Sequence, residues 1–212
     1  MQVSELVRAT AVPLATVKYY LREGLLPAAR KITARSSEYG EEHVRRLTLL
    51  RILRDIGAIP VGRLRELVDA VDNPRLSVHE VFARASDAIA SASTPPERAD
   101  AESQEIVDQL LDDIGWTAVR RDGVDVDNLA RVVTQIRRTG LFGVNAESLA
   151  HYATAADAIG RTEIERLPDH DDRAVRLERM VVGTVAYGQV LTILRRLSEE
   201  HHHAVAEAQR VL

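Results

Sequence analysis

The first 24 residues have the start and stop signals of two short helices joined by a tight turn. Residues 3–10 have apolar side chains at helical spacing, on one side of a helix of about two turns. Pro13 is suited to the first position of a second helix, and Gly24 closes that helix. The chain therefore begins with a helix–turn–helix.

The rest of the chain is predicted to be helical, apart from one short stretch. Residues 27–40 have no helical period and form a polar, basic string, which predicts a loop or a small hairpin. Aromatic residues make up only 4% of the chain, while Ala, Leu, Val and Arg are abundant, so helix is favoured over a β-sandwich or barrel. We expect an all-α protein with a small β wing, with further helices at 41–56, 60–71, 77–89, 94–114, 127–138, 145–159 and from 171 to the C-terminus.

The charge is divided unevenly along the chain. Residues 1–76 contain 13 Lys+Arg and 9 Asp+Glu, while the remainder contains 15 and 23, although the whole chain has a net charge of only −4. Such asymmetry suggests a basic binding module joined to a body with another role. We predict two domains, a winged helix–turn–helix at 1–73 and a helical bundle at 77–212.

Several chemistries are excluded or disfavoured. The chain has no cysteine, which excludes disulfides, thiolate zinc sites, iron–sulfur clusters and cysteine nucleophiles. The seven histidines lack metal-ligand spacing, and no catalytic arrangement of side chains is apparent. We therefore expect no metal, no cofactor and no enzymatic activity. No signal peptide or membrane span is recognisable, so we expect a cytoplasmic protein with no membrane partner.

The second helix has one face suited to DNA. At about 100° per residue, Leu14, Tyr20 and Leu21 lie within about 60° of Val17, which predicts a core face. The opposite face contains Ala15, Lys18, Tyr19 and Arg22. Cations and a phenol can contact phosphates and bases, and the second helix of a helix–turn–helix enters the major groove. Taken alone, the same strip could be a solvated helix face.

At this point the sequence resembles the MerR-type transcriptional regulators. The resemblance covers about residues 1–72 and rests on several linked motifs, which are Val3-Ser4-Glu5-Leu6-Val7, Ala11-Val12-Pro13-Leu14-Ala15-Thr16-Val17-Lys18-Tyr19-Tyr20, Glu23-Gly24-Leu25-Leu26-Pro27, Tyr39-Gly40-Glu41-Glu42-His43-Val44-Arg45-Arg46-Leu47 and Leu53-Arg54-Asp55-Ile56-Gly57-Ala58-Ile59-Pro60. It implies a winged helix–turn–helix, a homodimer on a pseudo-palindromic operator in double-stranded DNA, distortion of that DNA, and action on RNA polymerase at the promoter.

The resemblance also assigns residues. Thr16, Lys18 and Tyr19 match the recognition-helix contacts of the family, and the wing contains Arg30, Lys31, Arg35 and Tyr39. Two positions depart from the family pattern. Lys18 stands where the family usually has arginine, which keeps the charge but loses the planar fork. Residues 36–38, Ser-Ser-Glu, replace the usual Gly-Tyr-Arg run, and Arg35 is the candidate that substitutes for its phosphate contacts.

The acidic half has no recognised family and is only loosely similar to the helical bodies of TetR-type repressors. A small organic effector would need an apolar pocket with a few polar groups, and the candidate residues, which could equally be core, are Phe82, Trp116, Phe142, His151, Tyr152, Met180 and Tyr187. The last helix is apolar on more than one face, which predicts either an intramolecular core helix or a dimer interface. Residues 77–93 are the competing dimer interface. The alternative function is an architectural or excision-type DNA-binding protein without an effector.

Overall fold

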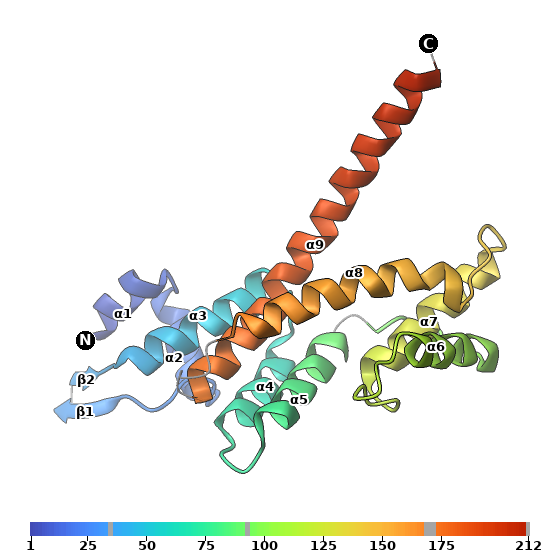
Figure 1. Ribbon diagram of the computed structural model, residues 1–212. Helices are drawn as coiled ribbons and strands as arrows, with labels where there is room; N and C mark the ends of the chain where they lie inside the picture. Colours follow the sequence, from blue (N-terminus) through green and yellow to red (C-terminus); the bar gives the residue numbers. More distant parts are fainter. Residues whose placement is uncertain (34–35, 92–93, 168–172, 211–212) are drawn as a thin grey trace. The chain divides into compact units, whose positions relative to one another are not determined.

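The computed structural model describes residues 1–33, 36–91, 94–167 and 173–210 (Figure 1). The described residues form nine helices and one two-stranded antiparallel sheet. This confirms the prediction of an all-α protein with a small β wing. The chain packs as two compact units, unit 1 with Met1–Val68 and Leu177–Leu212 and unit 2 with Asp69–Arg176. The functional division at 1–73 and 77–212 stays a prediction.

Unit 1 begins with the expected helix–turn–helix and wing. Helix α1 (Val3–Thr10) and helix α2 (Leu14–Arg22) are followed by strands β1 (Arg30–Thr33) and β2 (Ser36–Glu38), by α3 (Glu41–Asp55) and by the start of α4 (Val61–Asp72). The acidic side chains of Glu41 and Glu42 lie in the first turn of α3, where their negative charge interacts favourably with the positive end of the helix dipole. Leu6, Val17, Tyr20, Leu47, Leu50, Leu53 and Leu64 are almost completely buried and form the core.

The turn between α1 and α2 is held by specific contacts. Ala11 has a φ of 54°, the left-handed conformation that a residue with a Cβ adopts at a cost. The Thr10 hydroxyl donates to the carbonyl of Leu6 at 2.8 Å, and Arg51 of α3 donates to the carbonyl of Thr10 at 3.0 Å. The hydrogen bond from Arg51 therefore ties the turn to α3.

Ala11→Gly should raise the free energy of unfolding by about 0.5–1 kcal/mol, because glycine removes the strain of the left-handed conformation. Ala9→Gly is the matched control. Ala9 lies exposed in the last turn of α1, so the same substitution there should lower the free energy of unfolding by up to about 1 kcal/mol. Urea unfolding followed by circular dichroism measures both. A loss of stability in Ala11→Gly would show that the turn is not strained.

Helix α9 (Arg173–Arg210) contributes its residues from Leu177 onward to unit 1. Leu177, Val181 and Val185 are buried on one face. Val185 lies so close to Gly57 that a Cβ at position 57 would be 2.8 Å from its Cγ1 and 2.7 Å from the carbonyl oxygen of Leu53. On the same stretch of α9, the carboxylate oxygens of Glu178 lie 3.6 Å from Nε of Arg45 and 3.7 Å from Nε of Arg46, both in α3.

Beyond this contact, α9 leaves the core of its unit. From Tyr187 to Arg210 every described residue is exposed, and Figure 1 shows this stretch continuing as a single helix. The interpretation of α9 as a core helix covered within the chain is therefore wrong for residues 187–210. This stretch is exposed because the face that is apolar and buried at Val181 and Val185 becomes charged further along the helix. Arg195, Arg196 and Glu199 lie on that face.

Unit 2 contains α5 (Val78–Ser91), α6 (Ala101–Asp113), α7 (Val124–Thr139) and α8 (Ala146–Glu165). Its core consists of buried residues from α6 and α7, namely Val107, Leu111, Val126, Ala130 and Val133. Partly buried side chains, Trp116 and Leu149 among them, pack around this core. A capping box starts α5, since Ser77 and Glu80 exchange hydrogen bonds at 2.7 and 3.2 Å.

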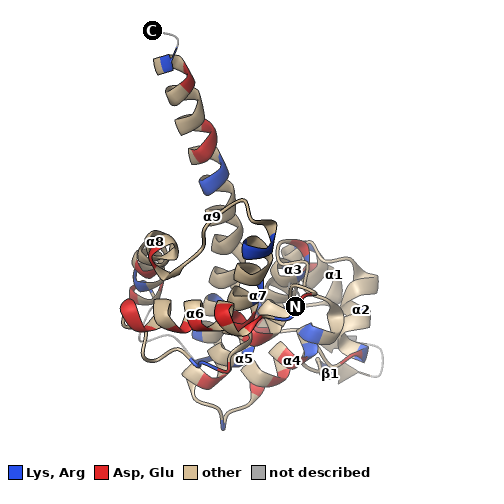
Figure 2. Cartoon of the chain, turned by 90° about the vertical axis from the view of Figure 1, so that its right-hand side faces the viewer, with Lys and Arg blue, Asp and Glu red and all other residues tan. Residues whose placement is uncertain are grey.

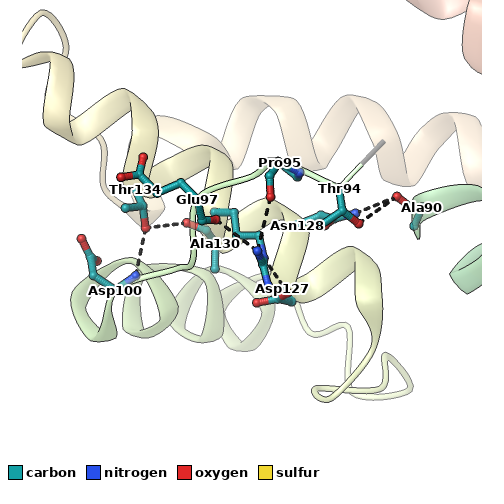
Figure 3. A network of polar contacts seen from close by, with 10 residues as sticks. Ala90, Thr94, Pro95, Glu97, Asp100, Asp127, Asn128, Ala130 and Thr134 are labelled. Atoms are coloured by element: carbon teal, nitrogen blue, oxygen red, sulfur yellow. Dashed lines mark hydrogen bonds and ion pairs between the residues drawn. The ribbon is translucent and has the colours of Figure 1, made fainter. Parts of the chain in front are cut away.

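The predicted helix start at Thr94 is wrong. Helix α6 begins at Ala101, where the Asp100 carboxylate accepts a hydrogen bond from the backbone N–H of Ser103 at 2.8 Å. Residues before it are tied to α7 instead. Figure 3 shows the carbonyls of Pro95 and Glu97 and the carboxylate of Asp127 converging on one guanidinium, that of Arg131. These bonds use the carbonyls of the segment, so it packs against α7 in a non-helical conformation.

Candidate nucleic-acid interface

Helix α2 presents the side chains that its spacing predicted. Val17 and Tyr20 are buried against the rest of unit 1, while Ala15, Lys18 and Arg22 are exposed and Thr16 and Tyr19 are half-buried. Leu14 was predicted in the core and is 42% exposed, which corrects that prediction. It is the first residue of the helix and lies at the edge of the core face, next to the exposed strip.

The C-terminal end of α2 is held by a chain of contacts. The Arg22 guanidinium lies 5.2 Å from the centroid of the Tyr19 ring, close enough for a cation–π interaction. A carboxylate oxygen of Glu23 lies 3.4 Å from Nε of Arg22. The guanidinium of Arg65 in α4 donates to the backbone carbonyl of Glu23 at 2.5 Å and to its carboxylate at 3.2 Å. Glu23 and Arg65 were missed by the sequence analysis, because contacts between residues 42 positions apart leave no periodic signal.

The wing is a short hairpin whose two strands are linked by an ion pair. Arg30 is directly opposite Glu38, and its Nε donates to the Glu38 carboxylate at 3.0 Å. This hydrogen bond and the charge of Arg30 hold the pKa of Glu38 below its usual value. Lys31 is exposed on the same strand. Arg35, predicted as the substitute wing contact, lies outside the described residues.

Tyr39 differs from the other predicted wing residues because its side chain is only 7% exposed. Its ring packs edge-to-face against that of His43, with the centroids 5.1 Å apart. His43 is also buried, and its Nδ1 accepts a hydrogen bond from the backbone N–H of Gly40 at 3.0 Å. Tyr39 and His43 therefore anchor the wing to the start of α3. A contact between Tyr39 and DNA stays a prediction.

Known proteins share this arrangement. The family described as "MerR HTH family regulatory protein" matches residues 1–71. The HTH-type transcriptional regulator ZntR homolog of Haemophilus influenzae is 24% identical over 81 residues, which is 38% of this chain and 59% of that protein. The crystal structure of the "putative transcriptional regulator SCO5550" of Streptomyces coelicolor A3(2) has a TM-score of 0.75 and 30% sequence identity, with 96% of both chains covered.

The chain belongs to the MerR family of transcriptional regulators. The family model ends at residue 71, whereas the Streptomyces structure is similar over both units.

The charge of this MerR-family protein follows its compact units. Unit 1 contains 16 Lys+Arg and 11 Asp+Glu, a net charge of +5, and unit 2 contains 12 and 21, a net charge of −9. Figure 2 shows acidic residues, coloured red, along α6 of unit 2. The predicted asymmetry is thus sharper in the fold than along the sequence. Long-range attraction to a polyanion is concentrated on the unit that contains α2 and the wing.

Glu38→Gln should tighten DNA binding about three- to tenfold, because it removes a negative charge from the wing and releases Arg30 for a phosphate. The dependence of affinity on salt should also steepen by about one unit of slope. Fluorescence anisotropy with a labelled duplex at several salt concentrations measures both quantities. Glu66→Gln is the control, since Glu66 forms its exposed ion pair with Arg63 on α4. Equal affinity and slope in wild type and Glu38→Gln would remove Arg30 from the interface.

The seven predicted effector residues are divided between the two units. Phe82, Trp116, Phe142, His151 and Tyr152 belong to unit 2, and Met180 and Tyr187 belong to unit 1. Phe142 is 70% and Tyr152 55% exposed. The His151 and Tyr152 rings are adjacent, with centroids 4.0 Å apart.

Trp116 lies against the core of unit 2. Its indole N–H donates to the Asp157 carboxylate at 3.0 Å. The hydrogen bond from Arg161, and secondly that from Trp116, lower the pKa of Asp157. Trp116 therefore has a structural partner already.

Two surface hollows border the helix–turn–helix and the base of the wing. The smaller, of about 60 Å³, is lined by Pro13, Thr16 and Arg51 among others, and the larger, of about 470 Å³, by Arg30, Glu38 and neighbours. Neither includes a predicted effector residue. Within the described ranges, no group of three or more His, Cys, Asp or Glu is arranged to hold a metal ion, and no helix is long and apolar enough to cross a membrane.

Proposed function

We propose that the protein binds a pseudo-palindromic DNA operator as a homodimer and regulates transcription from the adjacent promoter. The observation that carries the proposal is the strip formed by the exposed Ala15, Lys18 and Arg22 and the half-buried Tyr19 on the second helix of the helix–turn–helix. In such motifs this helix lies in the major groove, where its side chains reach base edges. Thr16 lies beside the strip and belongs to the same contact surface.

The wing completes the contact with DNA. Lys31, exposed on β1, binds backbone phosphate, while Arg30 is held by Glu38 and contributes less. Two copies related by a two-fold axis place their α2 helices in successive major grooves, so the operator has matching symmetry. The net positive charge of unit 1 favours this encounter with DNA. Binding weakens at higher salt concentration, because the release of counterions from the DNA is then less favourable.

The remaining parts of the proposal concern regulation. RNA polymerase is the partner at the promoter, and the protein acts in the cytoplasm without enzymatic activity. A small organic effector would act by favouring one arrangement of the dimer and so changing the distance between the two α2 helices. None of the effector candidates lines either of the two surface hollows, which favours a second candidate, an architectural or excision-type protein whose helical body serves only assembly.

Selection from a random duplex library with the full-length protein tests the proposal. We expect enrichment of one inverted repeat whose half-sites lie one helical turn, about 10 base pairs, or a multiple apart. A library without any enriched sequence would overturn it. Footprints along the genome separate the two candidates: a regulator protects one or a few promoters, whereas an architectural protein protects sites outside promoters.

A further inference from the structure

Helix α2 ends at a carboxylate that lies between two cations. Glu23 is the C-cap residue of α2 and directly follows Arg22. The C-terminal end of a helix dipole is negative, so it disfavours a carboxylate and favours a positive charge beside it. The Glu23 carboxylate lies 3.4 Å from Nε of Arg22 and 3.2 Å from Nη2 of Arg65 in α4. Both cations therefore compensate a negative charge at the end of the helix.

Arg65 binds the backbone as well as the side chain of Glu23. Its Nη2 also donates to the carbonyl oxygen of Glu23 at 2.5 Å. The last carbonyls of a helix have no partner within the helix, so this hydrogen bond satisfies a group that α2 itself leaves open. Next to Arg65 on α4, Leu64, Leu67 and Val68 are only 0–3% exposed. The core of unit 1 thus fixes α4 and holds the Arg65 side chain at the end of α2.

We propose that Arg65 is a positioning residue for DNA binding, which acts through Glu23. It neutralises the Glu23 carboxylate and so leaves Arg22 available to DNA. The inference rests on the proposed function and extends the DNA-binding machinery from α2 to α4. Arg22 is the side chain that gains, because it is the last cation of the strip on α2 and its side chain is 71% exposed.

The three charges at the end of α2 determine how strongly this part of the surface attracts a phosphate. Arg22, Glu23 and Arg65 together have a net charge of +1. Without Arg65 the sum is zero, and the Glu23 carboxylate competes with DNA phosphate for the Arg22 guanidinium. The groups are partly exposed, so solvent screens the competition and its effect is moderate.

A direct phosphate contact by Arg65 is the alternative, because its side chain is 54% exposed. The hydrogen bonds favour the indirect role. Nη2 of Arg65 donates to two oxygen atoms of Glu23, and turning toward a phosphate would take this donor from both. The two roles differ in one consequence: an indirect effect disappears when the Glu23 charge is removed, whereas a direct contact does not depend on that charge.

Arg65→Met tests the proposal in two backgrounds, the wild type and Glu23→Gln. Fluorescence anisotropy with a labelled duplex of the selected operator, at several salt concentrations, measures the affinity and its salt slope. Arg65→Met should weaken binding about tenfold in the wild-type background. In the Glu23→Gln background it should weaken binding at most about twofold and leave the salt slope unchanged, because no carboxylate then competes for Arg22.

Arg63→Met is the matched control, since it removes the same charge from α4. Arg63 forms an exposed ion pair with Glu66 at 2.8 Å, and its loss should change the affinity at most about twofold in either background. Arg65→Lys should retain the wild-type affinity within about threefold, because a positive charge suffices to neutralise Glu23. Circular dichroism and urea unfolding check that each variant is folded.

Three results would overturn the proposal. The first is unchanged affinity in Arg65→Met. The second is an equal loss of affinity in both backgrounds, which would show a purely structural role of Arg65. The third is a salt slope that falls by about one in the Glu23→Gln background, which would show that Arg65 is itself a phosphate ligand. A wild type that binds no duplex would instead contradict the proposed function, and this failure is evident before any residue is substituted.

Discussion

Replacing Glu178 with alanine should lower the free energy of unfolding of unit 1 by about 3–5 kcal/mol. Glu178 is 9% exposed and lies between Arg45 and Arg46 of α3, at 3.6 and 3.7 Å. Arg46 is itself only 5% exposed, so the substitution would remove a carboxylate that faces a buried guanidinium. Loss of one member of a buried ion pair costs far more than loss of a surface pair.

Urea unfolding and hydrogen exchange of the α3 amides measure this effect. Glu66→Ala is the control, because its carboxylate forms an exposed pair with Arg63 and its loss should change the free energy of unfolding by at most about 0.5 kcal/mol. If Glu178→Ala were as stable as Glu66→Ala, the contact between α9 and α3 would not hold the helix in place.

Arg22→Ala should weaken operator binding about ten- to a hundredfold, and Tyr19→Ala should do the same. The two side chains form one unit, since the Arg22 guanidinium stacks on the Tyr19 ring at 5.2 Å. Neither loss should unfold the domain, because the Arg22 side chain is 71% exposed and the neighbouring Val17 and Tyr20 supply the packing.

Fluorescence anisotropy with the selected operator measures these losses, with circular dichroism as the check on folding. Arg195→Ala removes the same charge from the exposed side of α9 and serves as the control. A phosphate contact by Arg22 should also lower the salt slope by about one. Unchanged affinity with intact helix content would refute the assignment of α2 to the groove.

The local features of the site were predictable from sequence because they depend on neighbouring residues. Pro13 and Gly24 bounded the second helix, which the structure places at Leu14–Arg22, and the helical period separated Val17 and Tyr20 from Lys18 and Arg22. Leu14 was misplaced because an angular position says nothing about where the covering helices end. A residue at the first position of a helix can lie on the core face and still be exposed, because the covering helices end before they reach it.

Long-range contacts were not predictable. The bond from Arg65 to Glu23 and the pairing of Arg45 and Arg46 with Glu178 join positions far apart in the chain. The start of α6 was placed too early because Thr94 to Glu97 has the pattern of a capping box, while Arg131 of α7 binds the carbonyls that such a helix would need. A side chain 34 residues away thus overrides a local signal.

The ratio of affinities for the selected operator and for a scrambled duplex of equal length tests the central claim most directly. Both must be measured at one physiological salt concentration, because the non-specific part of binding depends on salt. A regulator whose α2 helix reads bases should bind the operator at least about 1,000-fold more tightly than the scrambled duplex. A ratio near one would mean that the basic unit binds DNA only through phosphates, and would contradict the account.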